Sequence, residues 1–176
     1  MSESPFNYDQ ALKLLRTRGM SKKRIAHSIG VADTARDLAR RIARRHPALP
    51  LNAEKVRVAA LLHDIGRTRE GDHELNSVKI LREEGLEDLA AIVMHGTFYE
   101  IQRLRGIEDP RLIPQSLENK LVAYADARFR LKPVTLKERF DDITARMAGD
   151  EEKSESVAMA LKRFVSMERE IMGLLQ

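Results

Sequence analysis

Apolar residues recur at intervals of three and four along almost the whole chain, and no segment alternates convincingly between apolar and polar residues. The first spacing is typical of amphipathic α-helices, whereas alternation is typical of β-strands. The chain also shows no internal repeat, low-complexity tract or linker-like change of composition. We therefore predict an all-α protein that folds as a single compact helical domain over residues 1–176, a length sufficient for a sizeable core.

Capping residues and glycines mark where the individual helices begin and end. The expected helical ranges are 7–18, 21–46, 52–66, 73–85, 86–96, 116–130, 135 onward and 154–175. Residues 97–115, which include two prolines, are expected to be irregular, and residues 147–156 are expected to form an exposed turn. In this prediction the core spans about residues 21–132, and helices at 7–18 and about 135–175 pack on it.

The chain contains no cysteine, which excludes disulfides and thiolate metal ligands. Any metal must therefore be held by histidine, aspartate or glutamate. No apolar segment approaches the ~20 residues needed to cross a bilayer, and the N-terminus lacks the pattern of a signal peptide. We therefore expect a cytoplasmic protein without a membrane partner. The net charge of +4 permits anionic partners without requiring them, because acidic residues are nearly as numerous as basic ones.

Several histidines and aspartates fall on helix faces that are otherwise apolar. His27 lies on the inward stripe of its helix, and Asp126 and His95 each lie one turn beyond inward apolar residues. His63 and Asp64 end the most apolar helix of the chain. Any one of these residues alone is explained better by a hydrogen bond in the core or by a helix cap. Together they favour a divalent cation, since one ion compensates the lost hydration of all of them.

The combination of His27, the pair His63-Asp64 and Asp126 resembles the ligand motif of the HD-domain superfamily of metal-dependent phosphohydrolases. The sequence HDIG at residues 63–66 is the form of the motif in one large branch of the family. Its glycine, Gly66, is expected to let the chain turn away from the site. An HD dipeptide alone is common by chance, but here the whole set matches in order and approximate spacing over most of the chain. The resemblance implies an α-helical fold and a metal ion held by these four ligands.

Two further histidines occur in segments that match the family pattern. His73 in "HELNSVKIL" and His95 in "AAIVMHG" lie where some branches place additional ligands. Branches with six ligands hold two ions, bridged by the aspartate of the HD pair, here Asp64. Whether the two histidines bind a second ion or contact the substrate stays open, as do plainer roles at a helix start and a helix end. Mixed imidazole and carboxylate ligands favour Mn, Fe, Co, Ni or Zn over Mg, so we expect one or two divalent transition-metal ions.

Basic residues near the motif are expected to hold a phosphate. Arg67 follows HDIG where the family often has lysine, and Arg128 and Arg130 follow Asp126. The alternative role for Arg67 is to balance the dipole at a helix C-terminus. The resemblance implies hydrolysis of a phosphoester, in a nucleotide or a related small phosphate, by a metal-activated water. In this interpretation Asp64 and Arg67 are the catalytic residues, and Asp64 orients or deprotonates the attacking water.

Two other functions are considered. A non-catalytic sensor would keep the metal pocket and bind a nucleotide or a partner without turnover, although the complete ligand set argues against it. A nucleic-acid partner is not expected, because acidic residues interrupt the arginine ridge on the second helix and aromatic residues for base stacking are scarce. This ridge consists of Arg36, Arg40 and Arg44, and the same alternative includes the basic run Lys22-Lys23-Arg24. The helices after residue 133 carry no readable chemistry, and we expect them to complete the bundle or to build a homodimer contact.

Overall fold

Residues 6–96 and 99–176 are described by a computed structural model of the chain. This part of the chain is helical and contains no β-strand, which confirms the predicted all-α class. Its α-helices are α1 (Tyr8–Thr17), α2 (Lys22–Arg45), α3 (Ala53–Leu62), α4 (His73–Glu83), α5 (Glu87–Val93), α6 (Tyr99–Arg103), α7 (Leu117–Ala127), α8 (Leu136–Arg146) and α9 (Glu151–Gly173). Two short 3-10 helices complete the order: η1 (Ile65–Thr68) after α3, and η2 (Pro110–Leu112) before α7.

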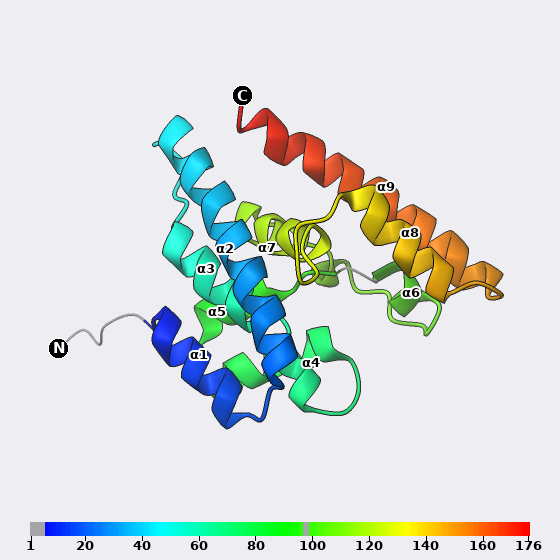
Figure 1. The fold of residues 1–176 in the computed structure, drawn as a ribbon, viewed down its shortest axis with the longest axis horizontal. Coiled ribbons are helices and arrows are strands. Elements are labelled where there is room, and N and C mark those ends of the chain that lie inside the picture. The colour runs from blue at the N-terminus through cyan, green and yellow to red at the C-terminus, as the bar shows by residue number, and fades with distance from the viewer. Residues whose placement is uncertain (1–5, 97–98) are drawn as a thin grey trace.

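Helices α3 and α7 form the centre of the molecule. The long helix α2 crosses in front of them in Figure 1 and packs against both. Residues 58–62 of α3 and 121–127 of α7 are buried without exception, as the all-round apolar character of α3 leads us to expect. Helices α1 and α5 contact α3, while the hairpin of α8 and α9 packs through α9 on α6 and α7.

Side-chain caps begin most of these helices. Ser21 and Asn52 cap α2 and α3, as the sequence predicts, by accepting hydrogen bonds from backbone N–H groups in the first turn. The capping box predicted for α8 is also present, since Thr135 and Glu138 each accept a hydrogen bond from the other's backbone N–H. These contacts satisfy donors that the start of a helix leaves unpaired, and they fix where α2, α3 and α8 enter the bundle.

The predicted end of α5 is wrong by three residues. The helix ends at Val93, and Met94 already has extended backbone angles. The side-chain amide of Asn119, which comes from α7, donates hydrogen bonds to two carbonyl oxygens in the last turn of α5. A tertiary contact therefore completes this helix end, and His95 lies on the segment after α5 and not on the helix itself.

The predicted end of α7 is also wrong by three residues. The helix stops at Ala127, and the chain turns so that Phe129 lies against α2. A methyl group at Gly30 of α2 would overlap the ring of Phe129, so the two segments are in direct contact. This packing ends α7 without a local stop signal. Consequently Arg128 and Arg130 lie in the connection to α8, and not on the helix that carries Asp126.

The predicted end of α3 at Gly66 is wrong by four residues, because the helix ends at Leu62 and Ile65–Thr68 form η1. Two other stretches also differ from the prediction. The segment 97–115, expected to be irregular, contains the short helices α6 and η2, while Thr97 and Phe98 lie outside the described residues. Helix α9 begins at Glu151, so the turn before it is shorter than the expected 147–156. None of the helices in the described part of the chain has the length and apolar character needed to cross a membrane.

Candidate metal centre

Six polar side chains that are distant in the sequence converge between α2, the end of α3, the start of α4 and α7. They are His27, His63, Asp64, His73, His95 and Asp126. The four imidazole rings form a continuous row, with centroid distances of 5.5 Å for His27–His63, 5.1 Å for His63–His95 and 5.6 Å for His73–His95. The fold therefore concentrates nitrogen and carboxylate ligands in the interior of the bundle.

The ligand atoms form two groups that have one carboxylate in common. In each group, one atom from each of three residues lies within 4.8 Å of the others. The first group consists of His27, His63 and Asp64, and the second of Asp64, His73 and His95. Asp126 adjoins the first group, because its Oδ1 lies 3.0 Å from His27 Nε2 and 3.5 Å from His63 Nε2. A single carboxylate, Asp64, thus lies between two candidate ion positions.

Backbone carbonyl groups fix the orientation of three imidazole rings. The Nδ1 atoms of His27, His63 and His95 lie 2.8, 2.7 and 3.0 Å from the carbonyl oxygens of Arg130, Ala60 and Val93, respectively. A carbonyl oxygen can only accept, so each Nδ1 carries a proton, and Nε2 is the nitrogen that faces the centre. Metal-ligating histidines are commonly held in this way by their outer nitrogen.

Two buried polar atoms of the first group have no hydrogen-bond partner among the described residues. They are His63 Nε2 and Asp64 Oδ1, which lie 3.9 Å apart. A buried polar atom that makes no hydrogen bond costs about 1–3 kcal/mol, and such atoms are rare in folded proteins. A divalent ion with nitrogen and oxygen ligands would satisfy both atoms, so the residues present fit a transition metal.

The two aspartates are held in their ionised form. Burial by itself raises the pKa of Asp64, but His63 and Arg67 outweigh burial and lower this pKa from 3.8 to about 2. Burial also opposes ionisation of Asp126, yet the hydrogen bond from His27 and the nearby His63 imidazole hold its pKa well below the usual value. Both carboxylates are therefore charged at neutral pH, as ligands of a divalent ion must be.

The histidines of the second group respond to their surroundings in opposite directions. Burial, His95 and Arg67 together lower the pKa of His73 from 6.5 to about 4, so its ring is neutral. Burial also favours a neutral His95, but the nearby Glu74 and other carboxylates outweigh burial and raise the pKa of His95. Proton binding and metal binding therefore compete at His95 more than at His73.

The turn that presents His63 and Asp64 is fixed by close packing of η1 on α4. A methyl group at Gly66 would overlap the backbone carbonyl oxygen of His73 and the amide nitrogen of Ser77. The Ser77 hydroxyl accepts a hydrogen bond from Gly66 N–H at 2.9 Å and lies 2.7 Å from the carbonyl oxygen of His63. Gly66 is thus required for the close approach of α4. The sequence predicted only that Gly66 would let the chain turn away from the site.

Glu74 belongs to the site but was not identified from the sequence. Its carboxylate is almost fully buried, and Oε1 lies 3.2 Å from Nε2 of His95. Acidic residues are common in the first turn of a helix, where they balance the dipole, so Glu74 carries no distinguishing signal. Only its position directly after His73 could have suggested a role.

Arg67 contacts ligand atoms of the second group. Its Nε lies 2.6 Å from Asp64 Oδ2, and its terminal NH2 group lies 2.9 Å from His73 Nε2. A guanidinium can only donate, so His73 Nε2 accepts this hydrogen bond, in agreement with a neutral imidazole ring. Arg67 therefore neutralises part of the charge of Asp64 at the edge of the site.

A pocket of about 680 Å³ opens beside the first group and is lined by His27, Asp64, Arg67 and Arg130 among others. Two of the three arginines proposed as phosphate ligands therefore lie at the site. Arg128 does not, because its guanidinium pairs with Glu168 at 2.9 Å and borders a separate pocket. The connection after α7 directs the side chains of Arg128 and Arg130 to different pockets. The sequence prediction placed both residues on one continuous helix and therefore did not anticipate this separation.

Comparison with known proteins identifies relatives over most of the chain. An uncharacterized protein of Methanocaldococcus jannaschii is 28% identical over 176 residues, which cover 96% of this chain and 99% of the relative. Two proteins named tRNA (cytidine(56)-2'-O)-methyltransferase also match. The protein of Picrophilus torridus is 30% identical over 67% of this chain. The protein of Thermoplasma volcanium is 31% identical over 88% of this chain. These matches span only 35% and 45% of the two methyltransferases. No solved structure matches the chain.

The sequence model of the HD domain matches residues 24–131. This range contains all six converging side chains and covers more than half of the chain. HD domains bind divalent metals, and the histidine and aspartate groups described above are able to hold such ions. The chain therefore belongs to the HD-domain family, a superfamily of metal-dependent phosphohydrolases.

Proposed function

We propose that the protein is a metal-dependent hydrolase that cleaves a phosphoester of a nucleotide or a related small phosphate. The observation that carries the proposal is the position of Asp64. This carboxylate belongs to both ligand groups, and it also lines the pocket. A phosphate that enters the pocket therefore comes next to the ligands and to two arginines, Arg67 and Arg130.

In this proposal His27, His63, Asp64 and Asp126 hold the first divalent ion. When bound, such an ion supplies a water of lowered pKa and neutralises phosphoryl oxygens. Besides holding the ion, Asp64 would orient or deprotonate the attacking water. His73 and His95 complete a second ion position with Asp64.

The arginines have separate tasks in this proposal. Arg67 is anchored by Asp64, so its planar guanidinium is pre-positioned to donate two hydrogen bonds to a phosphoryl group. Arg130 reaches the pocket from the connection after α7, while its backbone carbonyl orients His27. The same short segment therefore links the metal ligands to the substrate.

The substrate class is supported by the family and by the names of two relatives. Both methyltransferases are named for a nucleotide substrate within tRNA, but they share only a segment with this chain. We therefore take from them a nucleotide-containing substrate and do not extend methyl transfer to this protein. The pocket volume of about 680 Å³ lies within the usual range for small-molecule sites.

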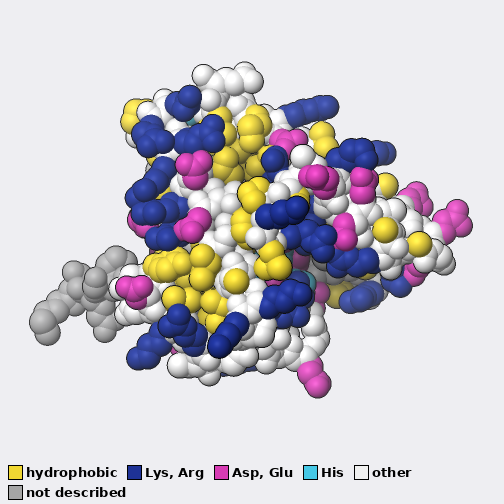
Figure 2. All heavy atoms as spheres, viewed as in Figure 1, with side chains coloured by type: hydrophobic (Ala, Val, Ile, Leu, Met, Phe, Trp, Pro, Cys, Tyr) yellow, Lys and Arg dark blue, Asp and Glu magenta, His cyan; other side chains and the backbone are white. Residues whose placement is uncertain are grey.

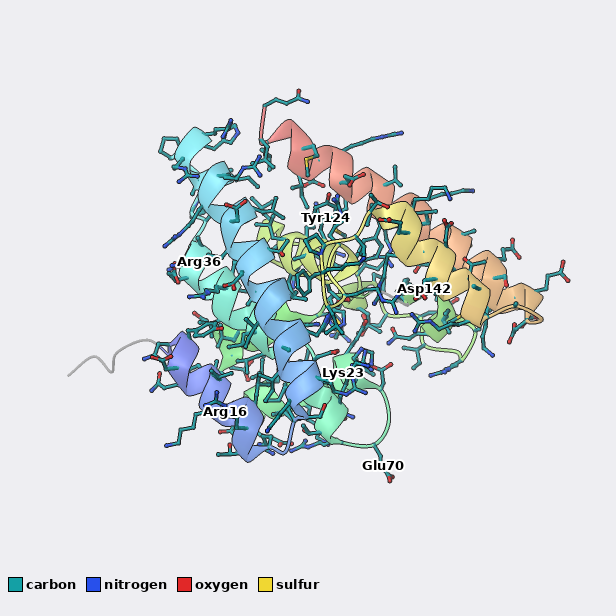
Figure 3. The ribbon with its side chains drawn as sticks, viewed as in Figure 1. Arg16, Lys23, Arg36, Glu70, Tyr124 and Asp142 are labelled. Carbon is teal, nitrogen blue, oxygen red and sulfur yellow. The ribbon has the colours of Figure 1, made fainter. Side chains whose placement is uncertain are left out.

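The test compares metal content and phosphate release in the wild type, Asp64→Asn and Glu70→Gln. Glu70 is a matched control because its side chain points away from the molecule (Figure 3). After loading with Mn or Fe, the wild type and Glu70→Gln should bind metal and release phosphate from a panel of nucleoside monophosphates and phosphodiesters. Asp64→Asn should lose both properties. Metal and nucleotide binding without any turnover would support a non-catalytic sensor, and undiminished activity of Asp64→Asn would overturn the assignment.

A further inference from the structure

The pocket beside the metal centre extends beyond the part of the chain that defines the family. Arg139 and Arg146 line its wall together with Lys132, and all three residues follow position 131, the end of the HD-domain match. The opposite wall comes from the start of α2 through Lys23 and Arg24. Dark blue side chains gather in this region between α2 and α8 (Figure 2), and Lys23 and Asp142 mark its two sides in Figure 3.

The positive charge of this region is only partly compensated. Asp142 pairs with both Arg130 and Arg146, so one carboxylate serves two guanidinium groups. Arg139 forms no ion pair with any described residue, and its Nε is a buried atom without a hydrogen-bond partner. Burial and the nearby Arg130 and Arg139 lower the pKa of Arg146, which reflects mutual repulsion of the cations. An anion placed among them would relieve this repulsion.

In the middle of α2, by contrast, arginines have carboxylate partners. Arg36 and Arg40, in the middle of the helix, both contact the carboxylate of Glu54. At the start of the same helix, Lys23 and Arg24 form no ion pair with a described carboxylate, and the first turn contains no acidic residue. The positive end of the helix dipole adds to these charges. Unpaired cations therefore occur on α2 at the pocket, where they face the arginines of α8.

We propose that Arg139 and Arg146 of α8, with Lys23 and Arg24 of α2, form a second anion subsite for a substrate that carries a further phosphate beyond the one at the metal centre. This inference rests on the proposed function. It further specifies that the substrate carries more than one phosphate group. The described lining contains no Phe, Tyr or Trp side chain on which a base could stack, so charge and not the base governs recognition here. The C-terminal helices thereby acquire a role in substrate selection.

The test measures binding by calorimetry in the presence of saturating Mn, so that it does not depend on turnover. The probes are adenosine 5'-monophosphate and adenosine 3',5'-bisphosphate. The variants are Arg139→Gln, Arg146→Gln and their combination, with Arg139→Lys and Arg146→Lys to retain the charge. Arg44→Gln is the matched control, because Arg44 is exposed and lies about 30 Å along α2 from its start.

The wild type should bind the bisphosphate about tenfold or more tightly than the monophosphate, because the second phosphate gains charge-assisted hydrogen bonds. Each glutamine substitution should weaken bisphosphate binding about tenfold, and the combination should remove the preference while monophosphate binding stays within about twofold. The lysine variants should retain most of the preference. Asp142→Asn, which removes the only paired carboxylate described in this wall, should strengthen bisphosphate binding.

An unchanged preference in the double variant, or an equal loss for both probes, would overturn the subsite. A third probe, a 5'-phosphorylated oligoribonucleotide, separates small substrates from RNA. If the glutamine variants weaken only the oligonucleotide, the region binds an RNA backbone and the small-molecule proposal fails. Selective bisphosphate binding without hydrolysis of any phosphoester would preserve the subsite while refuting the proposed function, so the two ideas fail separately.

Discussion

Arg67 Nε lies 2.6 Å from Oδ2 of Asp64, the carboxylate that belongs to both ligand groups. The same guanidinium contacts His73 Nε2, so it engages two of the three residues of the second group. Of the first group it contacts only the shared Asp64, and His63 Nε2 there makes no hydrogen bond with the described residues. The two candidate ion positions are therefore unequal before any metal binds.

We expect this inequality to appear in a metal titration. The wild type should bind one equivalent of Mn tightly and a second equivalent more weakly, because the second ion must displace Arg67. Arg67→Ala should bind the second equivalent about tenfold more tightly. The control is Arg69→Ala, which should behave as the wild type does because Arg69 pairs with Glu83 and not with a candidate ligand. Titration calorimetry gives both constants. A weaker or unchanged second site in Arg67→Ala would show that Arg67 does not compete with the ion.

Metal binding should also stabilise the fold. A ligand that binds only the folded state at 100 times its Kd raises the free energy of unfolding by about 2.7 kcal/mol. We expect Mn to raise the melting temperature of the wild type and of Glu70→Gln by the same amount. His63→Ala should lose most of this increment, whatever its own melting temperature without metal. The measurement is differential scanning fluorimetry with and without Mn, and a full increment in His63→Ala would remove His63 from the ligand set.

The close approach of η1 and α4 predicts unequal effects of two glycine substitutions. At Gly66 a methyl group would overlap backbone atoms of α4, which cannot move without shifting the helix, so Gly66→Ala should cost about 3 kcal/mol or more. At Gly173, in α9, a methyl group meets no described atom within 4 Å, and Gly173→Ala should stabilise the protein by up to about 1 kcal/mol. Urea unfolding of the metal-free variants measures both. Similar midpoints for the two variants would contradict the packing argument.

The helices and most of the candidate metal centre could be predicted from the sequence because they depend on local or regularly spaced signals. Apolar periodicity located α2, α3 and α7, and the family motif pointed to the six converging side chains that are the candidate ligands. The ends of α5 and α7 could not be predicted, since both are set by tertiary contacts. Asn119 completes the end of α5, and Phe129 packs on Gly30 beyond α7.

The residues that line the wall of the pocket could not be predicted from the sequence either. The motif pointed to Arg67, but Lys23 and Arg139 are more than 100 residues apart, and the sequence assigned neither of them to the site. Their common pocket depends on how the α8–α9 hairpin packs against the central helices. Glu74 was missed for a related reason, because a helix-start carboxylate shows its role only when α4 is placed against His95.

The lowered pKa of His73 predicts how stability depends on pH. Arg67, His95, Asp64 and Asp72 surround this ring, and its pKa is about 4 in the folded protein against 6.5 for an unperturbed histidine. Between these two values the unfolded chain binds a proton that the folded protein excludes. The free energy of unfolding therefore rises with pH across this window, by about 3 kcal/mol from His73 alone.

His73→Gln should remove this contribution, so its unfolding free energy should vary less steeply than that of the wild type between about pH 4 and pH 6.5. Both proteins are compared by urea unfolding in EDTA, because a bound ion would replace the proton at this nitrogen. His95 acts in the opposite sense, since its raised pKa gives stability that is lost as pH rises. That contribution is present in both proteins and largely cancels in the difference. Parallel pH profiles for the two proteins would show that His73 is not held neutral by its neighbours.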